Sequence, residues 1–329
     1  MLILTADDVR NALPMSEAIE AMKYAYASLS DGRAEMPLRT RLPVPKHDAA
    51  TLFMPAFVQS ESGDALAVKI VSLFPQNPAR GLAFIQAAVL VLEPDSGRPL
   101  ALLEGASLTA IRTGAASGAA IDLLARPDSH VLAVFGAGGQ GRSQTEAACG
   151  VRKIQKVWVF DTSIERAEAL AAEMAGRGNV PQDVSVARSS QQAVKDADII
   201  CAATTSKTPV FEDEHLKPGV HISAIGSYLP DMQEVPAKTV ARALVVVDSR
   251  SAVLAESGDL IQPIRAGLFG EDHIHAELGE IVLGRKTARQ SPKQVTYFKS
   301  VGLAVQDAMA AQLALRNADK MGLGQTVHW

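Results

Sequence analysis

The second half of the chain alternates short apolar runs with segments of helical spacing. The apolar runs are too short for most helices and suit buried strands. The strands are expected at 130–135, 156–160, 184–186, 197–202, 219–225 and 243–247, and the helices at 142–149, 164–176 and 190–195. Because strands that alternate with helices usually form a parallel sheet, this half is predicted to be a doubly wound α/β domain.

The first part of the chain has a different pattern. Two amphipathic helices begin near residues 6 and 16, and residues 105–124 predict a long helix rich in small side chains. Strand-like runs at 50–57, 66–72 and 83–92, with turns at 62–64 and 95–97, predict a mostly antiparallel sheet. The tail at 294–317 has the spacing of an amphipathic helix and is expected to return to this domain. We therefore expect a discontinuous α+β domain at 1–118, completed by 304–329, and a parallel-sheet domain at 119–303.

A glycine-rich turn follows the first strand of the α/β half. The sequence from 136 to 141 is G-x-G-x-x-G, and it lies between a strand and a helix. Gly136 allows the tight turn, Gly138 lets the backbone approach a pyrophosphate, and Gly141 lets the helix pack closely on the sheet. The amino terminus of the helix then offers free N–H groups to the anion. The turn predicts a Rossmann dinucleotide site whose cofactor-binding residues include Gly136, Gly138, Gly139, Gln140 and Gly141.

An acidic residue, Asp161, ends the next strand. Its carboxylate can accept hydrogen bonds from both ribose hydroxyls and repel a 2′-phosphate, which favours NADH over NADPH. Arg166 is near enough in sequence to soften this preference, so NADPH is a second candidate. The alternative interpretation of Asp161 is a solvated turn residue that opens the following helix. Because ligands bind at the carboxyl ends of parallel strands, the small polar tips of later strands are also expected at the cofactor, namely Thr204, Thr205 and Gly226.

Composition narrows the classes of protein and partner. The content of 47% hydrophobic and 21% charged residues is ordinary for a soluble globular chain of 329 residues. A net charge of −4 provides no general basic surface, so nucleic acid is not an expected partner. Two cysteines, Cys149 and Cys201, exclude a disulfide scaffold and a cysteine-based zinc site. The sequence shows no basic leader before a long apolar stretch and no apolar run of membrane length, so we expect a cytoplasmic protein without a membrane partner.

The histidines carry little chemistry. His273 and His275 lie among acidic residues, but no cysteine or further histidine is placed to complete a closed metal site. A solvated charged loop is the favoured interpretation, and no metal is expected. His221 lies within a predicted strand and is expected in the core or at its edge.

Three cations interrupt apolar patterns in the first domain: Arg39, Lys69 and Arg112. A buried cation needs an anion. One alternative is that each pairs with a local carboxylate, such as Glu104 for Arg112, and another places Lys69 on the solvent face of its strand. Taken together and beside a nicotinamide site, the three cations suit the clamping of a substrate carboxylate, for which arginine offers a bidentate fork.

Seven motifs taken together resemble the ornithine cyclodeaminase/mu-crystallin family over nearly the whole chain. They lie at 36–40, 68–69, 109–113, 136–140, 225–234, 277–280 and 298–302. The resemblance implies a homodimer in which the amino-terminal part and the last helix form the substrate-binding and dimerisation domain. It also implies that Arg39, Lys69 and Arg112 hold the substrate carboxylate. Thr113, Ser300 and Val301 are similar to residues near the nicotinamide.

Departures from the family pattern separate its chemistries. Cyclodeaminases of the family are expected to carry a glutamate just before the Met-Pro pair and an aspartate two residues after Gly226, where this chain has Leu52 and Tyr228. Without these carboxylates, deamination with cyclisation is disfavoured. The sequence from Pro230 to Glu234 is instead similar to ketimine reductases that act on 1-pyrroline-2-carboxylate or 1-piperideine-2-carboxylate.

The predicted reaction is therefore the NAD(P)H-dependent reduction of a cyclic ketimine 2-carboxylate to L-proline or L-pipecolate. Lys69, Arg112 and Asp231 are the candidate catalytic residues, with Lys69 as a proton source. Asp231 would partner the substrate amine, although a loop-capping role is an equal alternative. Other functions left open are an alanine or other amino-acid dehydrogenase, an ornithine cyclodeaminase, and a non-catalytic, crystallin-like protein that binds NAD(P)H.

Overall fold

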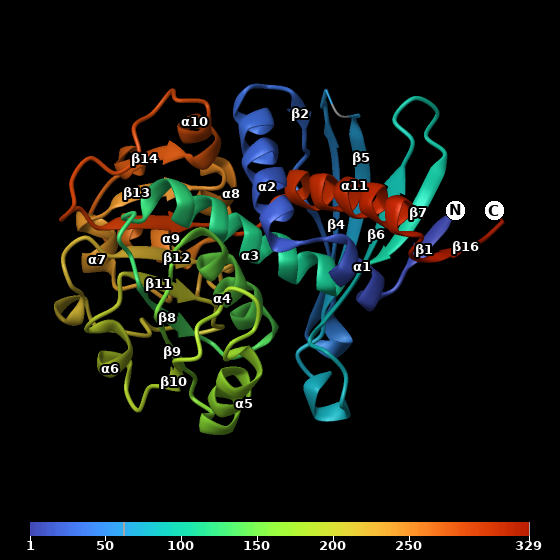
Figure 1. Ribbon diagram of the computed structural model, residues 1–329. Coiled ribbons are helices and arrows are strands. Elements are labelled where there is room, and N and C mark those ends of the chain that lie inside the picture. Colours follow the sequence, from blue (N-terminus) through green and yellow to red (C-terminus); the bar gives the residue numbers. More distant parts are fainter. Residues whose placement is uncertain (62, 329) are drawn as a thin grey trace. The chain divides into compact units, whose positions relative to one another are not determined.

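The computed structural model describes residues 1–61 and 63–328, so Ser62, in one of the expected turns, lies outside the described residues. The chain divides into two compact units. The first contains Met1–Arg112 and the segment from Leu303 onward, and the second contains Thr113–Gly302. The division falls after residues 112 and 302, whereas the sequence placed it after 118 and 303. Helix α3 (Gly105–Leu124) begins in the first unit and ends in the second (Figure 1).

The first unit is built on a sheet with eight strands among the described residues. The strand order is β16-β1-β7-β6-β5-β4-β2, and β3 pairs with β4. Strands β4 to β7 are antiparallel, as the pattern predicted, whereas β1 is parallel to β7. The strands are β1 Leu2–Leu4, β2 Ala34–Glu35, β3 Thr40–Val44, β4 Ala49–Val58, β5 Ala65–Leu73, β6 Ile85–Leu92, β7 Pro99–Glu104 and β16 Gln325–Thr326.

Helix α11 (Ala304–Met321), from the end of the chain, packs on β4, β5 and β6 of this sheet. Helices α1 (Ala6–Ala12) and α2 (Met15–Ser30) pack against α11. Along β5, alternate residues Ala65, Ala67, Lys69 and Val71 are buried, and Ile70 between them is exposed. A strand turns successive side chains to opposite faces, so Lys69 points to the face of the sheet that α11 covers.

The second unit is a parallel sheet with the strand order β10-β9-β8-β11-β12-β15-β13-β14 among the described residues. The prediction of a doubly wound α/β fold is confirmed. The order reverses direction between β8 and β11, and dinucleotides bind at the carboxyl edge beside such a reversal. The strands are β8 Val131–Phe135, β9 Lys156–Phe160, β10 Val184–Val186, β11 Ile199–Ala202, β12 His221–Ala224, β13 Leu244–Val247, β14 Ile274–Glu277 and β15 Thr296–Lys299.

Helices connect these strands (Figure 1). They are α4 Gly139–Val151, α5 Ile164–Met174, α6 Ser190–Val194, α7 Ala237–Arg242, α8 Arg250–Glu256, α9 Gly258–Arg265 and α10 Leu278–Val282. Within the described ranges, no helix is long and apolar enough to cross a membrane.

The prediction of a single helix at 294–317 is wrong in its first part. Residues 296–299 form β15, which lies between β12 and β13 and is fully buried. Threonine, tyrosine and phenylalanine favour strands, and the burial of all four side chains shows that both faces of the sheet are covered here. Gly302, at φ 82°, then ends the extended segment before α11 begins at Ala304.

Candidate active site

The glycine-rich turn lies between β8 and α4. Gly136 has φ 97°, and a Cβ there would lie 2.5 Å from the carbonyl oxygen of Ala203, so no other residue fits without a shift. A Cβ on Gly141 would collide with the carbonyl oxygen of Gly136. Gly138 and Gly139 are exposed and have open space around their Cα atoms. The turn thus leaves the first N–H groups of α4 accessible to an anion, with Gln140 in the first turn of the helix.

Asp161 lies directly after β9 and anchors the turn. Its Oδ2 accepts the N–H of Ala137 at 2.8 Å, and its Oδ1 accepts the N–H of Ser163 at 2.9 Å. Arg166 forms an ion pair with the same carboxylate at 3.0 Å. Burial acts to raise the pKa of Asp161, but the two backbone donors and Arg166 outweigh it and lower that pKa. Asp161 is therefore an anion at neutral pH, and it also supports the start of the next helix.

A buried glutamate that the sequence reasoning did not single out, Glu234, holds two strand tips. Its Oε1 accepts the N–H of Thr204 at 2.6 Å and the hydroxyl of Thr204 at 2.8 Å. Its Oε2 accepts the N–H groups of Gly226 at 2.6 Å and Ser227 at 3.0 Å. Burial raises the pKa of this carboxyl group. One carboxylate thus fixes the ends of β11 and β12, while Thr205 beside them is exposed.

A second buried carboxylate, Asp248, holds the end of β15. Its Oδ2 accepts the hydroxyl of Ser300 at 2.8 Å and the N–H groups of Val301 and Gly302 at 2.8 and 2.9 Å. Lys299 precedes Ser300 and is fully buried, and its Nζ lies 3.3 Å from Oδ2 of Asp259. The strand ends predicted at the cofactor are therefore fixed by acids that come from elsewhere in the second unit.

Thr113 is the first residue of the second unit and is buried in α3. Its carbonyl oxygen accepts the side-chain amide of Gln144, in α4, at 3.3 Å. The adjacent Gly114 packs so closely on Ser143 that a Cβ would lie 2.5 Å from the Ser143 carbonyl oxygen. Small residues at this point hold α3 against α4.

The first unit brings the predicted cations together around an acid. Lys69 and Arg112 are buried, and both contact Asp307 in the first turn of α11. The Lys69 Nζ lies 2.6 Å from Oδ2 of Asp307, and the Arg112 Nε donates to Oδ1 at 2.9 Å. The expectation that buried cations need an anion is confirmed. The alternative that places Lys69 on the solvent face is wrong, because Lys69 is buried. Glu104 is not the partner of Arg112, since its carboxylate accepts the N–H groups of Ala106 and Ser107.

The neighbouring residue Gln306 completes this cluster. Its side-chain oxygen accepts a hydrogen bond from Nη1 of Arg112 at 3.0 Å, and its amide donates to the hydroxyl of Tyr26 at 2.8 Å. Both Gln306 and Tyr26 are buried. The guanidinium of Arg112 is therefore held along Nε and Nη1 by two residues of α11.

The cluster has an excess of positive charge. Burial, followed by repulsion from Arg112, lowers the pKa of Lys69 to about 7, and Arg39 acts in the same direction. Asp307 opposes this shift. Arg39 itself is half-exposed and lies in the segment before β3 rather than in the core. Arg39 and Arg112 thus both act on Lys69, and Asp307 is the carboxylate paired with Lys69 and Arg112.

Asp231 lies on an exposed loop of the second unit. Its carboxylate forms an ion pair with Lys207 at 2.7 Å, and both side chains are more than half exposed. The hydrogen bond with Lys207 lowers the pKa of Asp231. These contacts join two surface loops.

The histidines have structural partners. His221 is buried, and its ring nitrogens lie 2.9 Å from the Thr296 hydroxyl and 3.0 Å from the Ser223 hydroxyl. Burial, helped by Arg289 and Arg152, lowers the pKa of His221 well below its usual value, so the ring is neutral. His273 and His275 contact main-chain oxygens, and the described part of the chain contains no group of three or more potential metal ligands.

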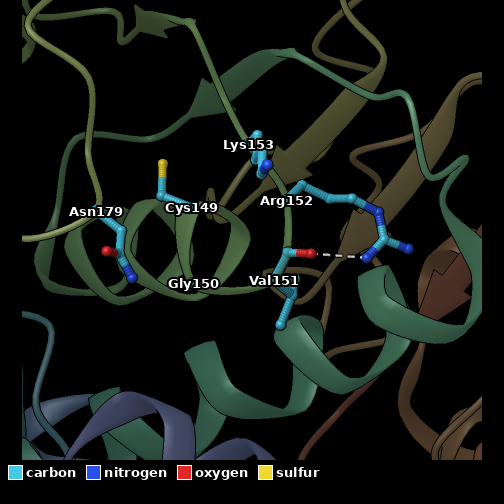
Figure 2. A pocket seen from close by; sticks show the side chains of 6 residues that line it. All are labelled: Cys149, Gly150, Val151, Arg152, Lys153 and Asn179. Carbon is cyan, nitrogen blue, oxygen red and sulfur yellow. Dashed lines mark hydrogen bonds between the residues drawn. The ribbon is translucent and has the colours of Figure 1, made fainter.

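A hollow at the carboxyl end of α4 (Figure 2) is not a candidate site for the dinucleotide. It is lined by Cys149, Gly150, Val151, Arg152, Lys153 and Asn179. The helix of a parallel βαβ unit runs against the strands, so this end of α4 lies opposite the edge that binds dinucleotides. Arg152 donates to the carbonyl oxygens of Val151, Ile121 and Ala125 at 2.7 to 3.1 Å and closes the ends of two helices.

The glycine-rich turn and the acidic strand tip of the second unit are typical of an NAD(H)-dependent oxidoreductase. The chain belongs to the ornithine cyclodeaminase/mu-crystallin family, whose sequence model matches residues 1–321. The resemblance seen in the sequence motifs is therefore confirmed.

Three relatives are similar over their whole length. The chain is 40% identical over 330 residues to Delta(1)-pyrroline-2-carboxylate reductase of Bacillus cereus, with 100% of both chains covered. The structure of Thermococcus litoralis Delta(1)-pyrroline-2-carboxylate reductase in complex with NADH and L-proline has a TM-score of 0.95 and 42% identity, over 99% of this chain and 100% of that one. An archaeal alanine dehydrogenase dimer with bound NAD has a TM-score of 0.91 and 31% identity, over 100% and 99% of the two chains.

Proposed function

We propose that this protein reduces a cyclic ketimine 2-carboxylate with NADH, converting 1-pyrroline-2-carboxylate to L-proline or 1-piperideine-2-carboxylate to L-pipecolate. The observation that carries the proposal is the pairing of two buried cations, Lys69 and Arg112, with a single carboxylate, Asp307. A buried cluster with an unbalanced positive charge is stabilised by one more anion. The carboxylate of the substrate supplies it, and Arg39 adds a third positive charge at the more exposed side.

The reduction transfers one hydride and one proton to the imine. The cofactor delivers a hydride to C2 of the imine, the electron pair of the C=N π bond passes to nitrogen, and that nitrogen takes a proton. In this proposal the ammonium of Lys69 donates the proton and Lys69 then regains one from solvent. NADH becomes NAD⁺ and the imine becomes a secondary amine. In this proposal Asp231 anchors its loop through the ion pair with Lys207, which is the alternative role that the sequence left open for it.

The second unit supplies the proposed cofactor contacts. Gly136, Gly138, Gly139, Gln140 and Gly141 would bind the pyrophosphate, and Asp161 the adenosine ribose. Thr204, Thr205 and Gly226 would line the site at the ends of β11 and β12, and Thr113, Ser300 and Val301 would lie near the nicotinamide. The close NADH-bound relative supports this assignment. NADPH is a weaker candidate because the Asp161 carboxylate repels a 2′-phosphate, although Arg166 moderates the repulsion.

We also propose a homodimer formed through the first unit. Apolar side chains on the face of the sheet turned away from α11 are partly or fully exposed: Phe53, Phe57, Leu66, Val68, Ile70 and Leu90. A contiguous apolar sheet face of this kind is typical of a protein interface. The dimeric alanine dehydrogenase supports the same assembly. The cytosol is the proposed compartment, in keeping with two buried, unpaired cysteines.

The direct test follows the loss of reduced-nicotinamide absorbance. Purified protein is supplied with NADH or NADPH and either cyclic imine, and pyruvate plus ammonia is run in parallel. The proposal expects turnover of a cyclic imine without added ammonia. Turnover that requires pyruvate and ammonia would instead indicate an alanine dehydrogenase, and ornithine consumption by NAD-loaded protein would indicate a cyclodeaminase. Nucleotide binding without any turnover would indicate a crystallin-like binder.

A further inference from the structure

We infer that Asp307 is the positioning residue of the substrate site: one carboxylate oxygen holds Lys69 and the other holds Arg112, so that both cations present their remaining donors to the substrate. This inference rests on the proposed reduction of a cyclic imine carboxylate. It assigns a role to a residue that lies outside every family motif in the sequence.

The geometry of the pair is specific. Oδ2 of Asp307 lies 2.6 Å from the Lys69 Nζ, and Oδ1 accepts from the Arg112 Nε at 2.9 Å. The exposed fractions of the three side chains are 1% for Lys69, 6% for Arg112 and 2% for Asp307, so water does not compete for these contacts. A carboxylate divided in this way fixes the separation of the two cations. Its place in the first turn of α11 is favourable for a negative charge.

The guanidinium of Arg112 is held at two of its three nitrogens. Nε donates to Asp307 and Nη1 donates to Gln306 at 3.0 Å. Within the described residues, Nη2 of Arg112 donates no hydrogen bond to the protein. Because guanidinium donors point in fixed directions in one plane, the two contacts from α11 determine where Nη2 points. Nη2 and the second hydrogen of Nη1 then form an edge that suits a substrate carboxylate.

The charged groups around Lys69 determine how strongly it holds its proton. Arg112 from α3 and Arg39 from the segment before β3 repel the ammonium, Asp307 from α11 attracts it, and the strand neighbours Met54 and Val89 are uncharged. The resulting pKa of Lys69 is about 7, so the lysine is near half protonation at neutral pH. A bound carboxylate adds a negative charge and favours the ammonium. Binding of the substrate thus draws in the proton that imine reduction consumes.

The test compares Asp307→Asn with the wild type. The amide keeps the shape but removes the charge, so the pKa of Lys69 should fall by about one to three units. With 1-pyrroline-2-carboxylate, the limb of the pH profile of kcat/KM that reports the proton donor should move to lower pH by the same amount. At pH 7.5 the variant should lose about tenfold or more in kcat/KM, with unchanged affinity for NADH. Asp307→Glu should recover part of the loss, and Asp319→Asn, an exposed acid on the same helix, should behave as the wild type.

Two outcomes overturn the inference. A pH limb that stays in place in Asp307→Asn, with activity lowered equally at every pH, would make Asp307 a structural residue only. An Asp307→Asn variant with unchanged KM and unchanged activity would show that Asp307 has no role in the reaction.

A second measurement does not depend on turnover. Protein labelled with ¹⁵N-lysine is titrated by NMR, and Lys69→Arg identifies the Lys69 signal. The titration midpoint should lie near pH 7 in the wild type, fall in Asp307→Asn, and rise when pyrrole-2-carboxylate, a planar and unreactive ring carboxylate, is added. These results without any imine turnover would refute the proposed substrate and keep the role of Asp307, whereas a midpoint indifferent to Asp307→Asn would refute that role whatever the substrate.

Discussion

Arg166 forms an ion pair with Asp161 at 3.0 Å, just beyond the end of β9. The arginine side chain is 63% exposed, whereas the aspartate is 9% exposed and also holds the glycine-rich turn through Ala137. The two charges have opposite preferences for the adenosine end of a cofactor. Asp161 suits ribose hydroxyls, and Arg166 is a cation that can turn to a 2′-phosphate without disturbing the turn.

Removal of Arg166 should therefore sharpen the preference for NADH. In Arg166→Ala, we expect kcat/KM for NADPH to fall by about tenfold while the value for NADH changes by less than about twofold. Initial rates with both cofactors give the ratio directly, and Arg188→Ala, an exposed arginine in the same unit, is the control. An unchanged NADPH to NADH ratio would show that Arg166 takes no part in the choice.

Arg112 should contribute to substrate binding and not to cofactor binding. In Arg112→Ala, KM for the cyclic imine should rise by about a hundredfold or more, since a charge-assisted contact inside the protein is lost. The affinity for NADH, measured by fluorescence, should stay within about twofold of the wild type. Arg98→Ala, an exposed arginine of the same unit, is the matched control. If NADH binding collapsed instead, Arg112 would not be a substrate clamp.

Glu234 should couple stability to cofactor affinity. It accepts four hydrogen bonds, two on each oxygen, and glutamine would turn an N–H₂ group toward two backbone or hydroxyl donors. In Glu234→Gln we expect a loss of about 3 kcal/mol in the free energy of unfolding and weaker NADH binding. Chemical denaturation and a binding titration measure the two effects, with the exposed Glu271→Gln as the control. Normal NADH affinity in a destabilised variant would separate Glu234 from the cofactor site.

Lys69 should make stability depend on pH. Its pKa falls from the usual 10.5 to about 7 on folding, so between these values the unfolded chain binds a proton that the folded chain lacks. The contribution of Lys69 to stability therefore rises with pH through this window and is lowest at and below pH 7. Relative to Lys69→Met, the wild type should gain about 1 kcal/mol per pH unit between pH 7.5 and 9. Denaturation curves across that range test this, and parallel curves for the two proteins would contradict it.

The apolar face of the first unit should govern assembly. Ile70 is 40% exposed at the centre of that face. In Ile70→Glu, a buried charge would oppose association, and the molar mass measured by light scattering should fall from that of a dimer to that of a monomer. Leu268→Glu, at an exposed leucine of the second unit, should leave the mass unchanged. A dimeric Ile70→Glu variant would place the interface elsewhere.

The glycine-rich turn between β8 and α4 could be predicted from sequence because its signals are local. The turn from Gly136 to Gly141 and the acid at Asp161 belong to one βαβ unit, and backbone contacts require glycine at positions 136 and 141. The strands β9 and β10 and the helix α3 were also placed at their observed bounds. Each has a strong periodicity or a run of apolar residues bounded by turn residues.

The contacts made by the buried acids Asp307 and Glu234 could not be predicted in the same way. Asp307 lies 195 positions from its partner Arg112, and an acid in the first turn of a helix is ordinary in any sequence. The one available signal was a Gln-Asp pair at positions 306 and 307, because the other residues from 304 to 311 are apolar. Glu234 was quoted within a family motif, but its four donors come from two different strand ends. The strand β15 was missed because it lies only a few residues before the long helix α11, whereas the equally short β10 is set apart by polar residues at 182–183 and 188–190.

The position of α11 has a consequence for synthesis of the chain. Strands β1 to β7 of the first unit are translated within the first 104 residues, yet the helix that covers the sheet and the acid that pairs with Lys69 emerge from the ribosome only with residues 304–321. Until then the nascent chain exposes an apolar sheet face, and Lys69 lacks the carboxylate that would stabilise its charge there. Contacts of such sequence separation make folding slow. The chain should therefore need protection from aggregation until α11 has been released.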